Sequence, residues 1–347
     1  MQRLSSIYRD QDRAYRADTC EPVKAAVRDG TIEQMALKRG AYPGRPLAKD
    51  ALPGVLTVGY WDAARDQNWG LDWHRNEGLE ITFLETGRLD FAVGGHNVEG
   101  QREEFFQQNL RPDDFTVTRP WQPHRIGDPN ITASKLHFLI LDVGVRHPHT
   151  QWKWPKWLVL TPEDLERLTI FLRHNEQPVW QSGPDLRHCF GRIARAVMTD
   201  KDGANISRLT VCLNELFVLL LDIFESSRAT LNESLSSSSR TVELFLAEFS
   251  QNQNDLAAPW SVAEMARHCG MGVTHFTHLV KQLTNLTPIE YLNRCRIDSA
   301  CRLLREKRNM TVTRVAMTCG FSSSQYFAAV FRRQLGCTPR VFRAEQV

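Results

Sequence analysis

The last third of the chain contains an internal repeat of about thirty residues, and this repeat restricts the possible folds more than any other feature. Residues 262–291 align with residues 312–342 when one residue is inserted. Cys269-Gly270 then falls on Cys319-Gly320. A duplication at this scale is typical of one supersecondary unit that occurs twice.

Each copy of the repeat predicts a helix-turn-helix unit. An alanine in the first helix (Ala266, Ala316) allows close approach of the second helix, and a glycine in the turn (Gly270, Gly320) can adopt a positive φ. The apolar face of the second helix consists of Phe276, Leu279, Val280 and Leu283 in copy one and of Phe327, Val330 and Phe331 in copy two. The opposite face carries hydrogen-bonding and cationic side chains, as in a recognition helix that enters the major groove of DNA. One copy alone would fit any helical hairpin, whereas two matching copies favour a DNA-binding pair.

The segment between the copies, 288–306, predicts one long helix that starts at Pro288. Its buried stripe consists of Ile289, Leu292, Cys295, Ala300, Leu303 and Leu304. About 18 residues at about 1.5 Å each give a length of about 27 Å, against about 34 Å for one turn of B-DNA. We therefore expect both recognition helices to reach successive major grooves, with bending of the DNA or partial insertion of one helix covering the difference.

The second copy contains the motif Ala316-x3-Gly320-Phe321-x4-Tyr326-Phe327-x3-Phe331-Arg332-x3-Gly336-x-Thr338-Pro339-x2-Phe342-Arg343. With this motif, residues 241–343 resemble the DNA-binding domain of the arabinose-regulator (AraC) family. The resemblance implies that double-stranded DNA is the partner of this region. It assigns base contacts to Thr274, Thr277, His278, Ser324 and Gln325, and phosphate contacts to Lys281, Arg332 and Arg333.

Two positions depart from the family pattern. Ala329 stands where relatives often carry a long cationic side chain, which weakens the expected base reading by the second unit. Gly272 replaces the usual capping serine of the first recognition helix, at an expected cost of a few tenths of a kcal/mol.

The distribution of charge along the chain agrees with a DNA-binding function. Residues 241–347 contain thirteen Lys and Arg against eight Asp and Glu, in a chain whose net charge is +3. This basic end is the expected contact region for nucleic acid.

The eight cysteines are scattered without a Cys-x-x-Cys pair, so we expect reduced thiols. Neither a signal-peptide pattern nor a membrane-length apolar run is present, so we expect a cytoplasmic protein with no membrane partner.

The N-terminal part predicts a β-rich domain followed by helices. Short β-branched and aromatic runs at 55–61, 79–85, 88–93, 115–118 and 135–143, with turns at 85–88 and 93–96, indicate an antiparallel barrel or sandwich. Helices are expected from Pro162 onward, at 185–198 and at 206–224. The last of these is apolar around much of its circumference, which fits either a core helix or a dimer interface.

These elements define an α+β protein in five segments. They are an N-terminal arm (1–50, extended at 41–46), a cupin-like barrel that binds an effector (51–158), a helical dimerisation or connecting region (159–228), a Ser-rich linker (229–240) and the all-α domain with two helix-turn-helix units (241–347).

Residues 70–140 resemble, more loosely, the cupin-like effector domain common in this family. His74, Glu80, Gly87 and His124 keep part of the framework of a metal cupin, but Asp72 stands where one histidine belongs. The preferred interpretation is that His74, Glu80 and His124 bind a small polar effector by hydrogen bonds. Trp61, Trp69, Trp73 and Trp121 lie around the same segments and fit either stacking surfaces for a sugar, with Trp73 and Trp121 as effector contacts, or packing in the core or at its rim. The alternative is a metal bound by Asp72, His74, Glu80 and His124. We expect no cofactor.

The resulting hypothesis is a sequence-specific transcriptional regulator, an activator, that responds to a small effector. Its expected partners are double-stranded DNA, the effector, a second copy of the chain and RNA polymerase. The competing hypotheses are a metal-dependent cupin enzyme fused to a DNA-binding tail and a non-specific architectural DNA binder.

Overall fold

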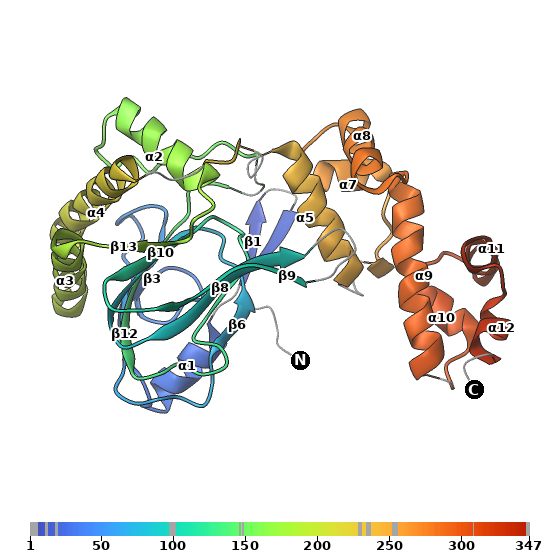
Figure 1. The fold of residues 1–347 in the computed structure, drawn as a ribbon, viewed down its shortest axis with the longest axis horizontal. Helices are drawn as coiled ribbons and strands as arrows, with labels where there is room; N and C mark the ends of the chain where they lie inside the picture. Colours follow the sequence, from blue (N-terminus) through green and yellow to red (C-terminus); the bar gives the residue numbers. More distant parts are fainter. Residues whose placement is uncertain are drawn as a thin grey trace. The chain divides into compact units, whose positions relative to one another are not determined.

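The computed structural model divides the chain into two compact units, an N-terminal unit made of residues 1–95 and 104–237 and a C-terminal unit made mainly of residues 238–347. The residues that it describes are 6–10, 13–17, 20–96, 102–145, 147, 149–227, 231–233, 237–251, 256–307 and 309–344. Figure 1 shows strands concentrated in the first unit and helices alone in the second. The α+β fold class expected from the sequence is therefore confirmed.

A seven-stranded sheet forms the centre of the N-terminal unit. In spatial order it contains β13 (Val179–Gln181), β10 (Asp114–Thr118), β7 (Leu79–Thr86), β12 (Ser134–Leu141), β5 (Val55–Ala63), β3 (Glu33–Lys38) and β4 (Arg45–Pro46). All neighbouring pairs are antiparallel except β3 and β4. The central strands are buried almost along their whole length, because both faces of the sheet are covered.

A four-stranded sheet faces one side of this central sheet. It contains β6 (Leu71–His74), β11 (His124–Ile126), β8 (Leu89–His96) and β9 (Arg102–Leu110), in that order. One hydrophobic core joins Leu71 and Phe91 of this sheet to Trp61 and Phe138 of the larger one. The predicted barrel or sandwich is thus present as two facing sheets, and a separate hairpin consists of β1 (Ser6–Asp10) and β2 (Arg13–Ala17).

Helices cover the other face of the central sheet. They are α2 (Pro162–His174), α3 (Pro184–Thr199) and α4 (Ile206–Ser226), close to the predicted bounds. Thr161 caps α2 by accepting a hydrogen bond from the Asp164 amide, as the sequence predicts. Phe190 of α3 stacks on Phe83 of β7 with ring centroids 5.0 Å apart, which fixes the helix layer on the sheet.

The expected N-terminal arm is wrong for residues 20–50. This segment contains α1 (Glu21–Arg28), β3 and β4, and it contributes Val23, Ile32 and Ala36 to the core between the sheets. Tyr42, which was expected in an extended stretch, is 4% exposed and donates a hydrogen bond from its hydroxyl to Glu77 Oε2 over 2.8 Å. The burial of residues 33–38 depends on pairing with β5, which the local sequence does not reveal.

Two further boundaries differ from expectation. The turn predicted at 93–96 lies within β8, because the amide of Gly94 pairs with the carbonyl of Pro123 and extends the strand. The end of the predicted linker, from Ser238, already belongs to a helix. Residues 228–230 and 234–236 of the linker lie outside the described part of the chain.

The C-terminal unit consists of helices in the predicted order. They are α5 (Ser238–Gln251), α7 (Val262–His268), α8 (Val273–Thr284), α9 (Pro288–Glu306), α10 (Val312–Thr318), α11 (Ser324–Leu335) and α12 (Pro339–Ala344). The turn glycines Gly270 and Gly320 both have positive φ, 67° and 81°, as the repeat predicts. The long helix α9 has the predicted bounds.

Local sequence signals explain where α9 begins. Thr287 accepts a hydrogen bond from the Glu290 amide, while the Glu290 carboxylate accepts one from the Thr287 amide, and Pro288 occupies the first helical position. This capping box satisfies two amides that the helix itself leaves without a partner.

Replacing Thr287 by Ala removes this cap, so we expect the free energy of unfolding of the C-terminal unit to fall by about 1 kcal/mol. Urea denaturation followed by circular dichroism measures the change. Ser322→Ala, in an exposed turn, is the matched control and should leave the midpoint unchanged. An unchanged midpoint in Thr287→Ala would show that the capping box does not stabilise α9.

Candidate nucleic-acid interface and ligand cavity

Helix α8 presents the predicted polar face of the first unit. Phe276, Leu279 and Val280 are buried in the core of this unit. This leaves Thr274, His278 and Lys281 exposed and Thr277 half-buried on the other side of the helix. Gly272 is the N-cap residue and makes no side-chain hydrogen bond, as expected from its lack of a side chain.

Helix α11 presents the corresponding face of the second unit. Phe327, Val330 and Phe331 are buried, whereas Gln325, Arg332 and Arg333 are exposed. Ser324 is half-buried, and its hydroxyl lies 3.4 Å from Gln325 Oε1. The helix is capped by Ser323, whose side chain accepts a hydrogen bond from the Tyr326 amide.

Helices α8 and α11 both pack on α9, which connects the two helix-turn-helix units within the C-terminal unit (Figure 1). Its 19 residues correspond to a length of about 28 Å at about 1.5 Å per residue. An exposed polar face flanked by cations is what a helix needs to read base edges while its cations bind phosphates. The arrangement supplies two such faces at the two ends of one rigid helix.

A cavity with about 590 Å³ of empty space, its mouth included, lies between the two sheets of the N-terminal unit. The strand register places its wall residues in rows across the central sheet. The rows are Glu80, Ile140 and Thr57; then Thr116, Thr82 and Phe138; then Leu136, Trp61 and Gln34.

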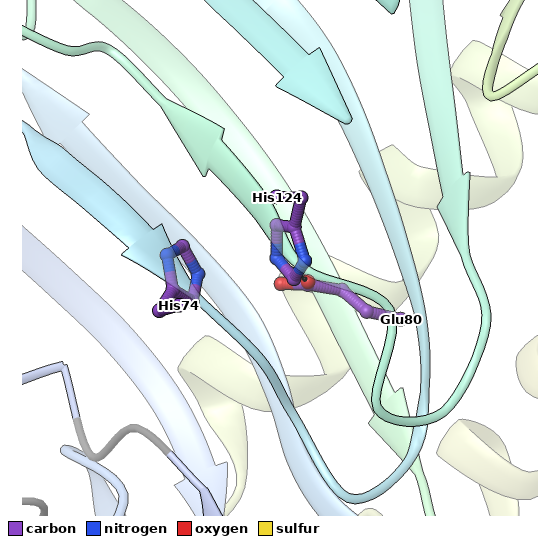
Figure 2. Close-up of side chains that lie close together, drawn as sticks. All are labelled: His74, Glu80 and His124. Atoms are coloured by element: carbon purple, nitrogen blue, oxygen red, sulfur yellow. Dashed lines mark ion pairs between the residues drawn. The ribbon is translucent and has the colours of Figure 1, made fainter. Parts of the chain in front are cut away.

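Three predicted residues meet at the end of this cavity. Figure 2 shows His74, Glu80 and His124, from β6, β7 and β11, with their polar atoms directed toward one another. His124 Nε2 lies 2.7 Å from Glu80 Oε2, and the side chains are 3% and 13% exposed. The two imidazole centroids are 4.2 Å apart. Residues fifty positions apart in the sequence are therefore brought into one polar cluster, which we call the His-Glu cluster.

Backbone carbonyls orient both imidazoles of the His-Glu cluster. His74 Nδ1 lies 2.7 Å from the carbonyl oxygen of Asp72, and His124 Nδ1 lies 2.9 Å from that of Gln122. Since a carbonyl oxygen only accepts, each Nδ1 carries a proton and each Nε2 is directed to the cluster. His124 Nε2 therefore faces the Glu80 carboxylate, and the two groups form a charge-assisted pair when His124 is protonated.

The Glu80 carboxylate is stabilised by its neighbours. Burial raises its pKa, but His124, His74 and the Asn76 amide together bring the pKa of Glu80 below its ordinary value. Asn76 Nδ2 and the Thr118 hydroxyl donate to Glu80 Oε2 over 2.9 and 3.3 Å. Glu80 is therefore a charged group at the end of a cavity whose walls are mostly apolar.

The remaining predicted cavity residues lie elsewhere. Strand β6 has one residue more than β11 between the pairs His74–His124 and Leu71–Ile126, so Leu71 and His74 both face the cavity and Trp73 does not line it. Trp121 does not line it either, because its indole N–H donates to the carbonyl of Val145 and its ring packs on the helix-side core. The expectation that Trp73 and Trp121 contact the effector is therefore wrong for this cavity.

Of the four tryptophans considered, Trp61 lines the cavity. Several other wall residues were not predicted from the sequence, among them Thr82 and Thr116, which share a hydrogen bond of 2.6 Å. Among the described residues, Thr57 Oγ1 and Gln34 Oε1 are buried wall atoms without a hydrogen-bond partner. The alternation of β5 and β7 could have indicated Thr57 and Thr82, whereas Gln34 belongs to a strand that was not predicted.

The His-Glu cluster is also the place where this unit can hold a metal ion. One ligand atom from each of its three residues lies within 4.8 Å of the others. Histidines that bind metals usually donate their other ring N–H to a carbonyl or carboxylate, and both imidazoles here do so. The four-residue set that included Asp72 is wrong, because Asp72 is exposed and its Oδ1 accepts the Trp73 amide at 2.6 Å. A metal would therefore have three protein ligands.

Comparisons with known proteins concern mainly the C-terminal unit. Residues 265–345 match a family model described as a helix-turn-helix domain. The HTH-type transcriptional activator RhaS of Escherichia coli strain SE11 is 34% identical over 148 residues, which is 43% of this chain and 51% of RhaS. RhaS of strain K12 / DH10B matches to the same extent. The chain spans about half the length of the curated relatives it matches.

The chain is also similar to solved structures. The DNA-binding domain of AdpA, in complex with a target DNA, is 33% identical, with 28% of this chain and 89% of that chain covered and a TM-score of 0.27. Apo ToxT from Vibrio cholerae strain SCE256 is 12% identical, with 86% and 100% covered and a TM-score of 0.35.

Two helix-turn-helix units carried by one long helix define a class of DNA-binding domain, and the C-terminal unit belongs to it. Within this class, the sequence motif of the domain is similar to that of the AraC family. RhaS is named as a transcriptional activator. Over the described part of the chain, no helix has the length and apolar composition to cross a membrane.

Replacing Glu80 by Gln should lower the free energy of unfolding of the N-terminal unit at pH 7, because both imidazoles lose the carboxylate that they face. A carboxyl group whose folded-state pKa is lowered stabilises the fold above its unfolded pKa, and this contribution is lost as the pH falls through the folded pKa. The difference between wild type and Glu80→Gln should therefore shrink below about pH 4.5.

Thermal denaturation between pH 3 and pH 8 measures this difference. Asp72→Asn is the matched control, because Asp72 carries the same charge nearby but lies outside the cluster. Equal effects of the two variants at pH 7 would contradict the role given to Glu80.

Proposed function

We propose that the protein is a sequence-specific DNA-binding transcriptional regulator, an activator, whose N-terminal unit binds a small-molecule effector. The observation that carries the proposal is the pair of polar helix faces on α8 and α11, held at the two ends of α9. An architectural DNA binder needs cations but not two faces rich in amide, hydroxyl and imidazole groups. The similarity to RhaS, a transcriptional activator, supports the direction of regulation.

In this proposal, the two faces have separate tasks. Thr274, Thr277 and His278 contact bases from the first unit, and Ser324 and Gln325 contact bases from the second. Lys281, Arg332 and Arg333 bind phosphates. All these side chains except Thr277 and Ser324 are exposed, and those two are half-buried. Gln325 is the strongest candidate for a specific contact because its amide can form two hydrogen bonds with adenine.

The effector would lie between the sheets of the N-terminal unit. Its polar group would hydrogen-bond to the His-Glu cluster, and its body would contact Trp61, Phe91 and Phe138. A sugar would use Trp61 as its stacking surface. The buried oxygen atoms of Thr57 and Gln34 are further hydrogen-bond acceptors for such a ligand.

The proposal includes a homodimer and a cytoplasmic protein that contacts RNA polymerase. Helices α2–α4, within the region 159–228, would form the dimer contact and connect to the DNA-binding domain. Val211 and Val218 are seven residues apart on one face of α4 and are 67% and 45% exposed, which supports a contact surface there.

Replacing Gln325 by Ala should relax the preference at one base pair of the binding site, with a loss of discrimination of about 1–3 kcal/mol at that position.

Replacing Arg332 by Ala should instead weaken binding to all duplexes alike and reduce the salt slope by about 1. Selection from randomised duplexes and salt titrations with both variants measure these effects. Unchanged selectivity in Gln325→Ala, or a purely sequence-dependent loss in Arg332→Ala, would contradict the assignments.

A further inference from the structure

The C-terminal unit contains two separate hydrophobic cores that divide α9 between them. Tyr291, Leu292 and Cys295 belong to the core of the first helix-turn-helix unit. Ile297, Ala300 and Leu304 belong to the core of the second. Between these two sets of residues lies the buried Arg296, and no acidic side chain among the described residues pairs with it.

Arg296 is 8% exposed, and its guanidinium forms directional contacts with the segment that precedes α7. Nε donates to the carbonyl of Leu256 over 2.8 Å, and Nη2 donates to the carbonyl of Ala258 over 2.7 Å. The guanidinium also lies over the ring of Phe321, 5.8 Å from its centroid. The Arg296 side chain thus contacts residues from both helix-turn-helix units.

Residues 256–258 form a wedge between the two helix-turn-helix units of the C-terminal unit. Leu256 is fully buried in the first core. On the other side, the wedge contacts the turn of the second unit at Gly320, where an added Cβ would lie 2.6 Å from the Leu256 carbonyl oxygen and 2.7 Å from the Ala257 Cα. Only a glycine allows this approach, since any side chain would push the wedge away. A second bridge crosses the same junction, from Asn293 Nδ2 to the Tyr326 hydroxyl over 3.1 Å.

Burying a charged arginine in this space costs free energy of desolvation. Burial lowers the pKa of Arg296, which reflects the cost of removing its charge from water. An apolar side chain of similar volume would avoid that cost but would make no hydrogen bond. What the guanidinium adds is a planar fork that holds two carbonyls at fixed positions.

We propose that Arg296, with the wedge 256–258 and Gly320, is a positioning device that fixes the angle between the recognition helices α8 and α11, and so determines which spacing of half-sites the protein accepts. The inference rests on the proposed function, because half-sites exist only if both helices bind DNA. Arg296 itself touches no base or phosphate in this account. Shifting one half-site by a single base pair rotates it by about a tenth of a turn, and a rigid junction cannot follow that rotation.

The test uses the full chain and a two-part duplex selected by the wild type. Arg296→Met fills the space without forming the fork, so we expect about tenfold weaker binding at the best spacing. Its affinity should also change little when one base pair is inserted or removed between the half-sites, whereas the wild type should lose at least about tenfold. Arg302→Met, an exposed residue on the same helix, removes the same charge and should keep the wild-type spacing preference.

Two further measurements keep the inference open to refutation. If Arg296→Met unfolds, two other variants replace it in the spacing series: Arg296→Lys, which keeps the charge but loses the planar fork, and Asn293→Ala, which loses the bridge to the Tyr326 hydroxyl. Hydrogen exchange without DNA should show faster exchange at 256–261 and 319–321 in the Arg296 variants than in Arg302→Met.

A wild-type chain that selects no duplex would overturn the proposed function. A wild-type chain that selects a two-part site, combined with an Arg296 variant that retains its strict spacing preference, would overturn this inference alone.

Discussion

The sharing of one helix by two hydrophobic cores is the constraint on which the C-terminal unit depends. The first half of α9 completes one core and the second half completes the other, so neither helix-turn-helix unit can move without bending or releasing this helix. Its start is fixed by the capping box at Thr287 and Glu290. The polar faces of α8 and α11 are therefore presented as a pair, and binding one half-site places the other helix near its own, which reduces the entropy lost on the second contact.

In the N-terminal unit, the alternation of single strands links the cavity to the helix layer. On β7, Glu80 and Thr82 line the cavity, whereas Ile81 and Phe83 belong to the core beneath the helices. Phe83 also stacks on Phe190 of α3. A ligand that shifts β7 by binding Glu80 or Thr82 would thus act on α3 through Phe83. Regulation requires in addition that the ligand binds one arrangement of the unit more tightly than the other.

The helical elements were predictable from the sequence because their signals are local. Thr161-Pro162 and Thr287-Pro288 mark helix starts by chemistry within four residues, and the repeat located both turn glycines. The grouping of His74, Glu80 and His124 was also expected, but only through family resemblance. The bulge in β6 that excludes Trp73, the burial of Tyr42 and the fork of Arg296 depend on residues far apart in the chain. No local pattern encodes such contacts, so the sequence could not predict them.

The most direct test of the central claim is selection of the full chain against a library of randomised duplexes. Two recognition helices fixed by a helix of about 28 Å predict an enriched motif in two parts, with centres about one helical turn, 10–10.5 base pairs, apart. Enrichment of no motif, or of two parts at freely variable spacing, would contradict the account of a rigid pair.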